Sequence, residues 1–466
     1  MKRVSRIADV QSFGFFDEML KFEEILKKTT PETLDDDMNY IETHYTVDYY
    51  DELANLCIIN SVMSAENIKN IIQITYKLCM KWPSFKNSLL YVFGSCDVIA
   101  PYSKLVRGLY QLGIFTFAEL VSETVFLDGF HLMFAKEIGR KDIIPNIPNL
   151  KENDWAIFDQ IMEYGYEVDS LGYSIITDNI EKLKDYASKE DFNPNQLINQ
   201  PYLSTTERSL LMTAIYFNTP KCIDYLFEIG AEFNHECLAA AVAANNRLLI
   251  DKYKDKQDIN YDTCTFNAVW YRRDEIFDEI MEKYDGKEVS LYNCIHMASY
   301  KYVYYFTENG APEAIPGCEP ALVEAAKDGE LTVVQYLISK KFDLNIKNEE
   351  GDTALHFAVH FNRYSITKLL LENGANVNVL NEEELTPVDI ARRYLFEEVE
   401  KLLIKYGGLS CEQLKSGENK EEDQENKNDK ISEKEEVDKP KTPVEESKKP
   451  EENADSAIDK QKSEEK

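Results

Sequence analysis

The sequence predicts an all-α protein: a solenoid of stacked helical hairpins, with an all-α region before it and a disordered acidic tail after it. Three observations predict this fold class: a 33-residue period between about 320 and 408, a related helix pattern at shorter spacing before it, and a final stretch without aromatic residues. These patterns divide the chain into four segments: 1–150, 151–315, 316–409 and 410–466.

The 33-residue period is clearest around one central unit. Gly351 opens the motif Gly-Asp-Thr-Ala-Leu-His-Phe-Ala, and a Leu-Leu-Leu run and Gly-Ala-Asn-Val-Asn follow it. Thr386 stands 33 residues after Thr353, and Ala325 stands 33 residues before Ala358. Leucine and alanine three positions apart in this motif share one helix face. A period of this length predicts stacked supersecondary units that bury their apolar faces against their neighbours.

On these motifs, residues 320–408 resemble the ankyrin repeat family. The resemblance implies units of a turn, two antiparallel helices and a hairpin finger, stacked side by side. It also implies that the finger tips and the exposed side of the first helices line a concave groove that binds proteins. Two positions depart from the family pattern: Asp389 replaces the usual histidine, and Pro320 replaces threonine.

A weaker mark of the same kind continues towards the N-terminus. It consists of the pairs Leu211/Ala214, Leu238/Ala241, Thr265/Ala268, Ile295/Ala298 and Leu322/Ala325. The pairs are spaced by 27, 27, 30 and 27 residues. Six residues fewer than 33 is about the length of a projecting finger. We therefore expect the units between about 205 and 315 to keep the helix pair and lose much of the finger. The stretch 155–315 is similar to uncharacterised repeat domains found with ankyrin repeats in flagellated protists.

Residues 1–150 show no such register. Apolar residues at helical spacing, interrupted by prolines, predict an all-α region; for example, Ser64 is a plausible N-cap for a helix from Ile68 to Leu78. We expect this region to pack on the first repeat and to cover an apolar end that would otherwise be exposed.

Composition and charge exclude several classes of function. The net charge of −32 argues against binding to nucleic acid or anionic lipid, because the field of the protein repels polyanions. No run reaches the roughly 18 apolar residues that membrane insertion needs. The nine cysteines are odd in number and lack C-x-x-C spacing. This indicates reduced thiols in a cytoplasmic compartment, with the nucleus as the alternative.

The C-terminal segment has the composition of a disordered chain. Residues 411–466 hold 19 acidic residues and 12 lysines but no Phe, Tyr or Trp. Such a segment cannot bury enough apolar surface to offset its conformational entropy. Two roles stay open: a solubilising tail, or a recognition tail around Thr442-Pro443.

No motif predicts catalysis, a cofactor or a metal site. The sequence lacks the phosphate-binding, dinucleotide-binding and serine-hydrolase motifs, so we expect no enzymatic activity. His356 and His360 stand four residues apart, but no glutamate follows His356 as a metalloprotease helix requires. The resemblance implies that His356 braces the backbone of neighbouring turns, and His296 is expected to do the same. A cysteine paired with His44 or His131 would make a nucleophile, but no local pattern supports it.

Binding positions follow from the resemblance. On the last two units they are Glu349, Glu350, Asp352, His360, Phe361, Glu382, Glu383, Leu385, Arg393 and Tyr394. Lys327 and Asp328 match them in the preceding unit. Five of the six finger positions in the last two units are acidic. An acidic rim with an aromatic floor suits the basic surface of a protein partner, because charge steers encounter and aromatics supply buried area. The alternative is that these acids are merely solvated.

The expected function is therefore non-enzymatic: a scaffold or adaptor that recognises a protein partner. Two alternatives stay open. In the first, the chain is a targeting subunit whose residues 1–150 carry an unrecognised catalytic or ligand-binding activity. In the second, the chain is a structural protein that assembles with itself.

Overall fold

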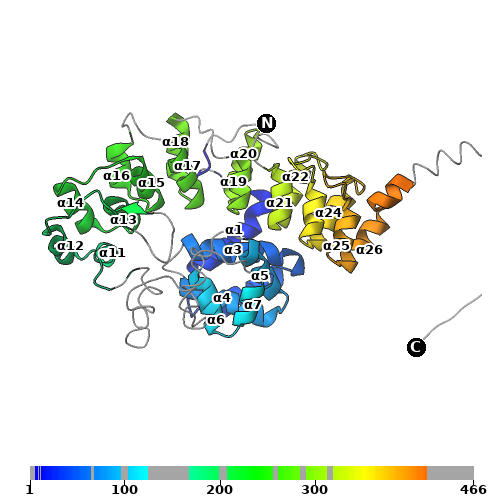
Figure 1. Cartoon of the computed structure of the whole chain (residues 1–466), viewed down its shortest axis with the longest axis horizontal. Coiled ribbons are helices and arrows are strands. Elements are labelled where there is room, and N and C mark those ends of the chain that lie inside the picture. Colours follow the sequence, from blue (N-terminus) through cyan, green and yellow to red (C-terminus); the bar gives the residue numbers. More distant parts are fainter. Residues whose placement is uncertain are drawn as a thin grey trace, which may run out of the picture. The chain divides into compact units, whose positions relative to one another are not determined.

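A computed structural model of the chain is shown in Figure 1. It describes residues 6–8, 10, 12–63, 68–95, 103–123, 166, 168–198, 207–254, 261–283, 290–311 and 319–416. The chain divides into a body, Met1–Cys411, and a C-terminal segment, Glu412–Lys466. Most of the predicted disordered tail, from residue 417 onward, lies outside the described residues. The division into four segments stays a prediction.

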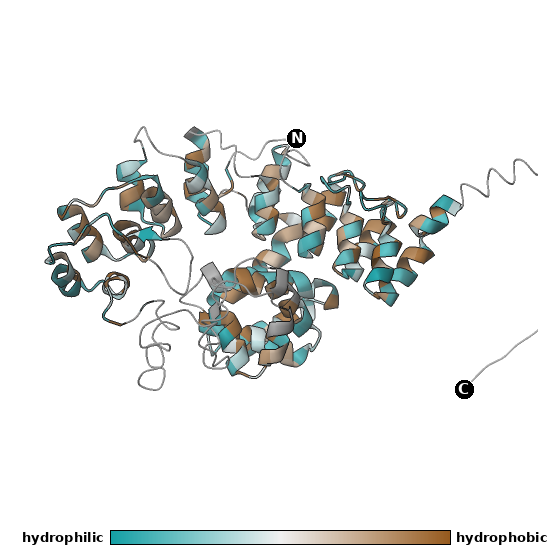
Figure 2. Cartoon of the chain, in the orientation of Figure 1, coloured by the Kyte–Doolittle hydropathy of each residue, from teal (hydrophilic) through white to brown (hydrophobic). Residues whose placement is uncertain are grey.

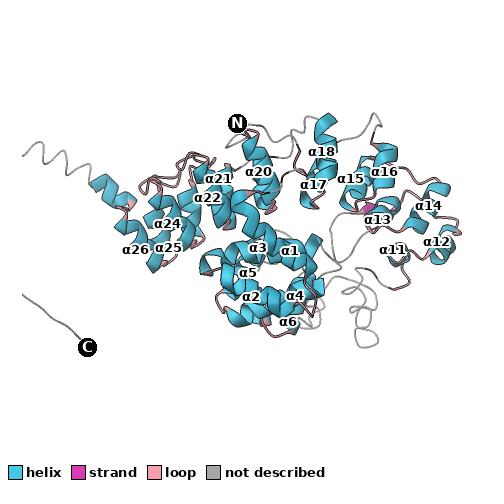
Figure 3. Ribbon diagram, turned by 180° about the vertical axis from the view of Figure 1, so that it is seen from behind, coloured by secondary structure: helices cyan, strands magenta, loops and turns pink. Residues whose placement is uncertain are grey.

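The body is all-α, as the sequence predicts. In the part of the chain that the structure describes, the only strands are β1 (Leu197–Ile198) and β2 (Arg208–Ser209), an antiparallel pair drawn in magenta in Figure 3. Single helices carry both polar and apolar residues (Figure 2), which is typical of helices packed on one face. None of the described helices is long and apolar enough to cross a membrane.

The N-terminal region consists of short helices around an apolar core. They are η1 (Gly14–Phe16), α1 (Asp17–Lys28), α2 (Leu34–His44), η2 (Val47–Tyr49), α3 (Tyr50–Met63), α4 (Ile68–Lys81), α5 (Phe85–Ser95), α6 (Ser103–Gln111) and α7 (Phe117–Glu123). Phe22, Leu53, Leu78 and Phe85 are fully buried in this core. The predicted helix beginning at Ile68 is confirmed as α4, and its expected N-cap lies outside the described residues.

Eight helical hairpins follow in the described residues. The first four are α11/α12 (Leu171–Ile176, Ile180–Ala187), α13/α14 (Leu210–Tyr216, Pro220–Glu228), α15/α16 (His235–Ala243, Arg247–Tyr253) and α17/α18 (Tyr261–Trp270, Asp274–Lys283). The last four are α19/α20 (Leu291–His296, Tyr300–Glu308), α21/α22 (Ala321–Asp328, Leu331–Ser339), α23/α24 (Ala354–His360, Tyr364–Glu372) and α25/α26 (Pro387–Arg393, Glu397–Lys405). First helices pack on first helices, such as α21 on α23, and second helices on second helices, such as α22 on α24.

Every hairpin turns in the same way. The turn contains one residue with positive φ: Asp178, Asn218, Asn245, Arg272, Ala298, Gly329, Asn362 or Leu395. Four residues before it stands a small, fully buried residue: Ser174, Ala214, Ala241, Ala268, Cys294, Ala325, Ala358 or Ala391. The carbonyl of the small residue accepts a hydrogen bond of 2.7–3.0 Å from the backbone N–H of the residue just before the second helix. This is the bond of a Schellman cap, which satisfies a terminal carbonyl and reverses the chain.

The fifth hairpin corrects the register predicted from the sequence. The expected pair Ile295/Ala298 is wrong, because Ala298 is the turn residue, with φ of +44°. Leu291 and Cys294 occupy the apolar and small positions instead. The error is four residues, about one helical turn, so the two candidate pairs lie on nearly the same helix face. From Asn218 onward the turns are spaced by 27, 27, 26, 31, 33 and 33 residues.

The predicted loss of the finger is confirmed for one connection. Residues 229–234, six in number, join α14 to α15, whereas the fourteen residues 340–353 join α22 to α23. The connections after α16, α18 and α20 include residues outside the described ranges.

The N-terminal region contacts the second helices of later units, contrary to the expectation that it packs on the first repeat. Phe16 stacks on Tyr300 of α20, with ring centroids 5.4 Å apart, and lies 4.8 Å from Tyr336 of α22. Glu23 of α1 pairs with Arg272 at 3.3 Å. Other polar contacts join Ile7 and Ala8 to Asp278, Asp51 to Arg363, and Asp48 to Ser365. Tyrosines on the second helices thus provide an apolar lateral surface, which repeat periodicity does not reveal.

Two carboxyl groups are buried where α3 meets the turn between α21 and α22. Glu52 and Glu330 are both fully buried. Thr332 donates its hydroxyl hydrogen to Glu52 at 2.8 Å, while Tyr300 and Asn55 donate to Glu330. Burial raises the pKa of both carboxyl groups, and the charge of Glu52 adds to the rise at Glu330. We infer that one of the two keeps its proton at neutral pH in the folded body.

A first prediction concerns the last turn. Leu395 has φ of +61° and is 83% exposed, so it bears the cost of a left-handed backbone without burying its side chain. Leu395→Asn should raise the free energy of unfolding by about 0.5–1 kcal/mol, measured by urea denaturation. The reverse change in the preceding turn, Asn362→Leu, should lower it by a similar amount. A destabilised Leu395→Asn variant would contradict this account of the turn.

A second prediction concerns pH. A folded-state pKa above the unfolded value of about 4.5 means that the folded body binds more protons. The stabilisation that the pair adds to the free energy of unfolding is therefore complete below pH 4.5, and it is lost as the pH rises through the folded pKa values. Glu330→Gln removes one ionisation and keeps a hydrogen-bonding group. In the unchanged protein the free energy of unfolding should fall between pH 5 and 8. In Glu330→Gln this fall should be smaller by about 1–3 kcal/mol.

The measurement is chemical denaturation at both pH values. Glu228→Gln, at the exposed end of α14, is the matched control and should keep the loss seen in the unchanged protein. If Glu330→Gln showed the same loss as the control, the buried pair would not govern the pH dependence.

Candidate protein-binding surface

The last two fingers are built alike and joined to each other. Asn348 and Asn381 occupy equivalent places, and the backbone N–H of each donates to the carbonyl four residues on, at 2.9 and 3.1 Å. The Glu382 N–H donates to the Glu350 carbonyl at 3.0 Å, which links one finger to the next. Gly351 has φ of +75°, and a Cβ atom there would lie 3.0 Å from the Glu382 nitrogen. Glycine therefore permits both the turn and the close approach of the fingers.

A hollow of about 200 Å³ lies between α23 and α25. Its lining residues are Asp352, His356, Phe357, His360, Asn381, Glu383, Leu385, Ile390, Arg393 and Tyr394. Six of these belong to the ten binding positions expected from the sequence: Asp352, His360, Glu383, Leu385, Arg393 and Tyr394. The structure thus brings these six together at one place.

Aromatic rings form one side of the hollow. The ring of His360 lies 4.8 Å from that of Tyr394 and 4.7 Å from that of Phe361, both edge to face. Such contacts hold the rings in defined orientations. Tyr394 is 43% exposed, so it offers apolar area to a partner. Burial lowers the pKa of His360, so its ring is neutral at pH 7.

The charges around the hollow are mostly negative. Arg393 pairs with Glu383 at 3.2 Å, and the Asn381 side chain donates to the Asp352 carboxylate at 2.8 Å. These contacts hold two of the acidic side chains in place. The other finger acids are exposed: Glu349, Glu350 and Glu382.

Phe361, also an expected binding position, does not line this hollow but a second groove, of about 550 Å³. One wall is the turn between α23 and α24, with Phe361 and Tyr364, and the other comes from the N-terminal region, with Asp48, Asp51 and Ser88. Repeat-based reasoning misses the N-terminal wall. Asp48 and Asp51 contact residues more than 300 positions away in the sequence, and no local pattern marks such a contact.

His356 is structural, as the resemblance implies. One ring nitrogen, Nε2, lies 3.1 Å from the Val379 carbonyl and 3.3 Å from that of Leu385, so the ring braces the next finger. Asp389 takes the equivalent place in the last unit and accepts the N–H of Thr386 at 3.0 Å. The substitution of aspartate for histidine therefore keeps the helix cap.

His296 does not repeat this role, which corrects a second expectation. Its side chain is 59% exposed, and Nδ1 lies close to the carboxylates of Glu324 and Asp328. The cause is the register of the fifth hairpin, because His296, like His360, stands two residues before the turn residue. Asn293 makes the capping box in this unit instead.

The described thiols do not support a Cys–His nucleophile. Burial raises the pKa to about 12 at four of them: Cys57, Cys79, Cys222 and Cys264. They are therefore protonated at neutral pH, whereas a nucleophile needs the thiolate. The seven described cysteines form no disulfide, and six of them are buried. Cys96, Cys318 and His131 lie outside the described residues.

Comparison with known proteins identifies the repeats. A family model described as ankyrin repeats, three copies, matches residues 295–414. An ankyrin repeat protein of Acanthamoeba polyphaga mimivirus is 44% identical over 55 residues, which are 12% of this chain and 7% of the viral protein. An ankyrin repeat protein of Fowlpox virus is 51% identical over 43 residues, 9% of this chain and 10% of its own.

A third relative carries an enzyme name. Palmitoyltransferase akr1 of Emericella nidulans is 39% identical over 70 residues, which cover 15% of this chain and 9% of the enzyme. The matches thus span a tenth or less of each of these relatives. Residues 295–414, whose hairpins and fingers have the expected geometry, are thus identified as ankyrin repeats.

Proposed function

We propose that the protein is a non-enzymatic scaffold or adaptor, and that it binds the basic surface of a protein partner on the concave side of its last two ankyrin units. Ankyrin repeats generally mediate protein–protein interaction. The observation that carries the more specific proposal is the hollow between α23 and α25, where exposed Tyr394 lies beside acidic fingers.

The binding mechanism is rigid display. Each hairpin packs on its neighbours, so exposed residues of the first helices and fingers can vary while the buried positions stay the same. Aromatic area at the floor supplies affinity, since a single exposed ion pair contributes only about 0.2–1 kcal/mol. The acidic fingers supply orientation and speed of encounter.

The alternative, an activity carried by residues 1–150, receives less support. The described helices of this region meet in an apolar core, with Phe22, Leu26 and Phe93 fully buried. An apolar helical core is what a packing region requires. Its contacts with α20 and α22 favour a supporting role for the repeats.

A third prediction tests the aromatic floor. The double change Phe361→Ala and Tyr394→Ala should reduce the yield of specific neighbours in proximity labelling at least tenfold, because it removes the area that a partner buries. The labelled neighbours are quantified by mass spectrometry in the native cell. The matched control is Phe266→Ala with Tyr406→Ala, two exposed aromatics on α17 and at the end of α26. Equal yields from the two double variants would exclude the hollow as the binding site.

A fourth prediction tests the acidic fingers separately. Changing Glu349, Glu350 and Glu382 to lysine should lower the yield of the same neighbours about tenfold, because like charges then oppose encounter with a basic surface. Lysine in place of the exposed acids Glu228, Glu236 and Glu372 changes the net charge equally and should leave the yield unchanged. A comparable loss in both triple variants would mean that only total charge matters.

A further inference from the structure

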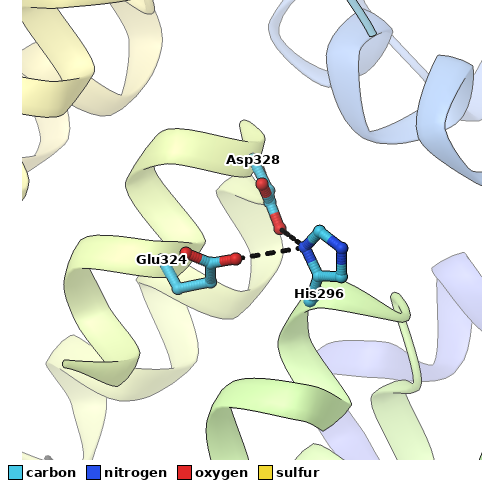
Figure 4. A group of neighbouring side chains, drawn as sticks. All are labelled: His296, Glu324 and Asp328. Carbon is cyan, nitrogen blue, oxygen red and sulfur yellow. Dashed lines mark hydrogen bonds and ion pairs between the residues drawn. The ribbon is translucent and has the colours of Figure 1, made fainter. Parts of the chain in front are cut away.

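Three side chains with metal-binding atoms converge between the fifth and sixth hairpins (Figure 4). His296 ends α19, while Glu324 and Asp328 stand four residues apart on α21. The Nδ1 atom of His296 lies 3.1 Å from Oε1 of Glu324 and 3.3 Å from Oδ2 of Asp328. All three atoms lie within 4.8 Å of one another, and this is the one such group in the described ranges.

The surroundings of the cluster hold its members in place. The Glu324 carboxylate is fully buried, and its second oxygen accepts a hydrogen bond from Lys327 at 3.3 Å. That contact leaves the first oxygen directed at His296, as Figure 4 shows. The ring of Tyr292 lies parallel to the imidazole, at 6.2 Å and 4°. Outer contacts of this kind orient ligands in metal sites.

The local charge favours a cation. Glu319 interacts electrostatically with both Glu324 and Lys327. Three carboxylates, those of Glu319, Glu324 and Asp328, therefore surround the single ammonium group of Lys327. Even with the His296 imidazole protonated, the three carboxylates leave one negative charge uncompensated in a partly buried place. A dication that replaces the imidazole proton would bring the group to neutrality, and the 59% exposed imidazole leaves a path from solvent.

We propose that His296, Glu324 and Asp328 form a zinc site, with water as the fourth ligand. Around tetrahedral zinc with bonds of about 2.0–2.1 Å, neighbouring donor atoms lie about 3.3 Å apart. The two separations from Nδ1, 3.1 and 3.3 Å, fit this geometry, and the two carboxylate oxygens lie within 4.8 Å of each other. One imidazole with two carboxylates is also a donor set that zinc accepts, whereas magnesium prefers oxygen alone.

The site would clamp two neighbouring hairpins together. Its ligands come from the first helices α19 and α21, at the junction between shortened and full-length repeats. Without metal, the hydrogen bonds to Asp328 and Glu324 raise the pKa of His296 to about 10, so a proton occupies Nδ1. Zinc must displace that proton, so binding releases it. This inference is independent of the proposed partner surface.

The test is a titration of the full chain with Zn²⁺ alone at pH 7.5, with excess Mg²⁺ present to occupy the acidic surface. We expect one equivalent to bind, with a rise in the thermal midpoint. Co²⁺ in its place should show the visible absorption of four-coordinate cobalt. His296→Ala and Asp328→Asn should each weaken binding at least about a hundredfold, since each removes a ligand. Both changes are at exposed or half-buried positions, and circular dichroism checks that each variant folds.

His235→Ala is the control, because His235 is an exposed histidine at the start of α15 and lies outside the cluster. It should bind zinc as the unchanged protein does. Equal zinc affinity in the unchanged protein and His296→Ala would overturn the proposal. So would the absence of any one-equivalent binding in the unchanged protein. In either case the cluster would be an imidazolium held between two carboxylates.

Discussion

One backbone hydrogen bond underlies the repeat body. In each hairpin, the carbonyl of a small buried residue accepts a hydrogen bond from the backbone N–H of the residue just before the second helix. The turn residue between them has positive φ. The bond closes only if the small residue lets the two helices approach, as Ala358 does. Because the turn reverses the chain in the same manner each time, successive first helices can lie against one another and successive second helices likewise. The finger length varies between units while this turn does not.

The two faces of the stack then serve different purposes. Second helices such as α20 and α22 present tyrosines that pack on the N-terminal region, and Phe16 anchors this contact. Polar groups at the same contact, above all Glu52 and Glu330, are buried with raised pKa values, so we expect its strength to depend on protonation. The first helices and fingers of the last two units retain exposed aromatic and acidic side chains. The proposed partner surface is therefore on the side that the N-terminal contact does not use.

Local features could be predicted from the sequence, whereas long-range ones could not. Leu355, Ala358 and the finger motif identify the regular units because each acts within its own hairpin or on the next one. The Leu-x-x-Ala mark is ambiguous where an isoleucine stands one helical turn from a leucine, as at Ile295 and Leu291, and there the register prediction is wrong. Six of the ten predicted binding positions meet at one hollow, since the 33-residue period determines their register. The N-terminal contact and the carboxyl pair join residues that are distant in sequence, and the His296 cluster depends on the corrected register. No local sequence pattern predicts any of the three.

The central claim is that the first-helix side of the ankyrin units, and not the second-helix side, meets the partner. A photo-crosslinking amino acid placed in the native cell at Tyr394, on the first-helix side, or at Ile404, 49% exposed on α26, tests it directly. The account predicts a specific crosslinked protein from position 394, lost when Phe361 is also changed to alanine, and none from position 404. The same crosslinked protein from position 404, with none from 394, would contradict it.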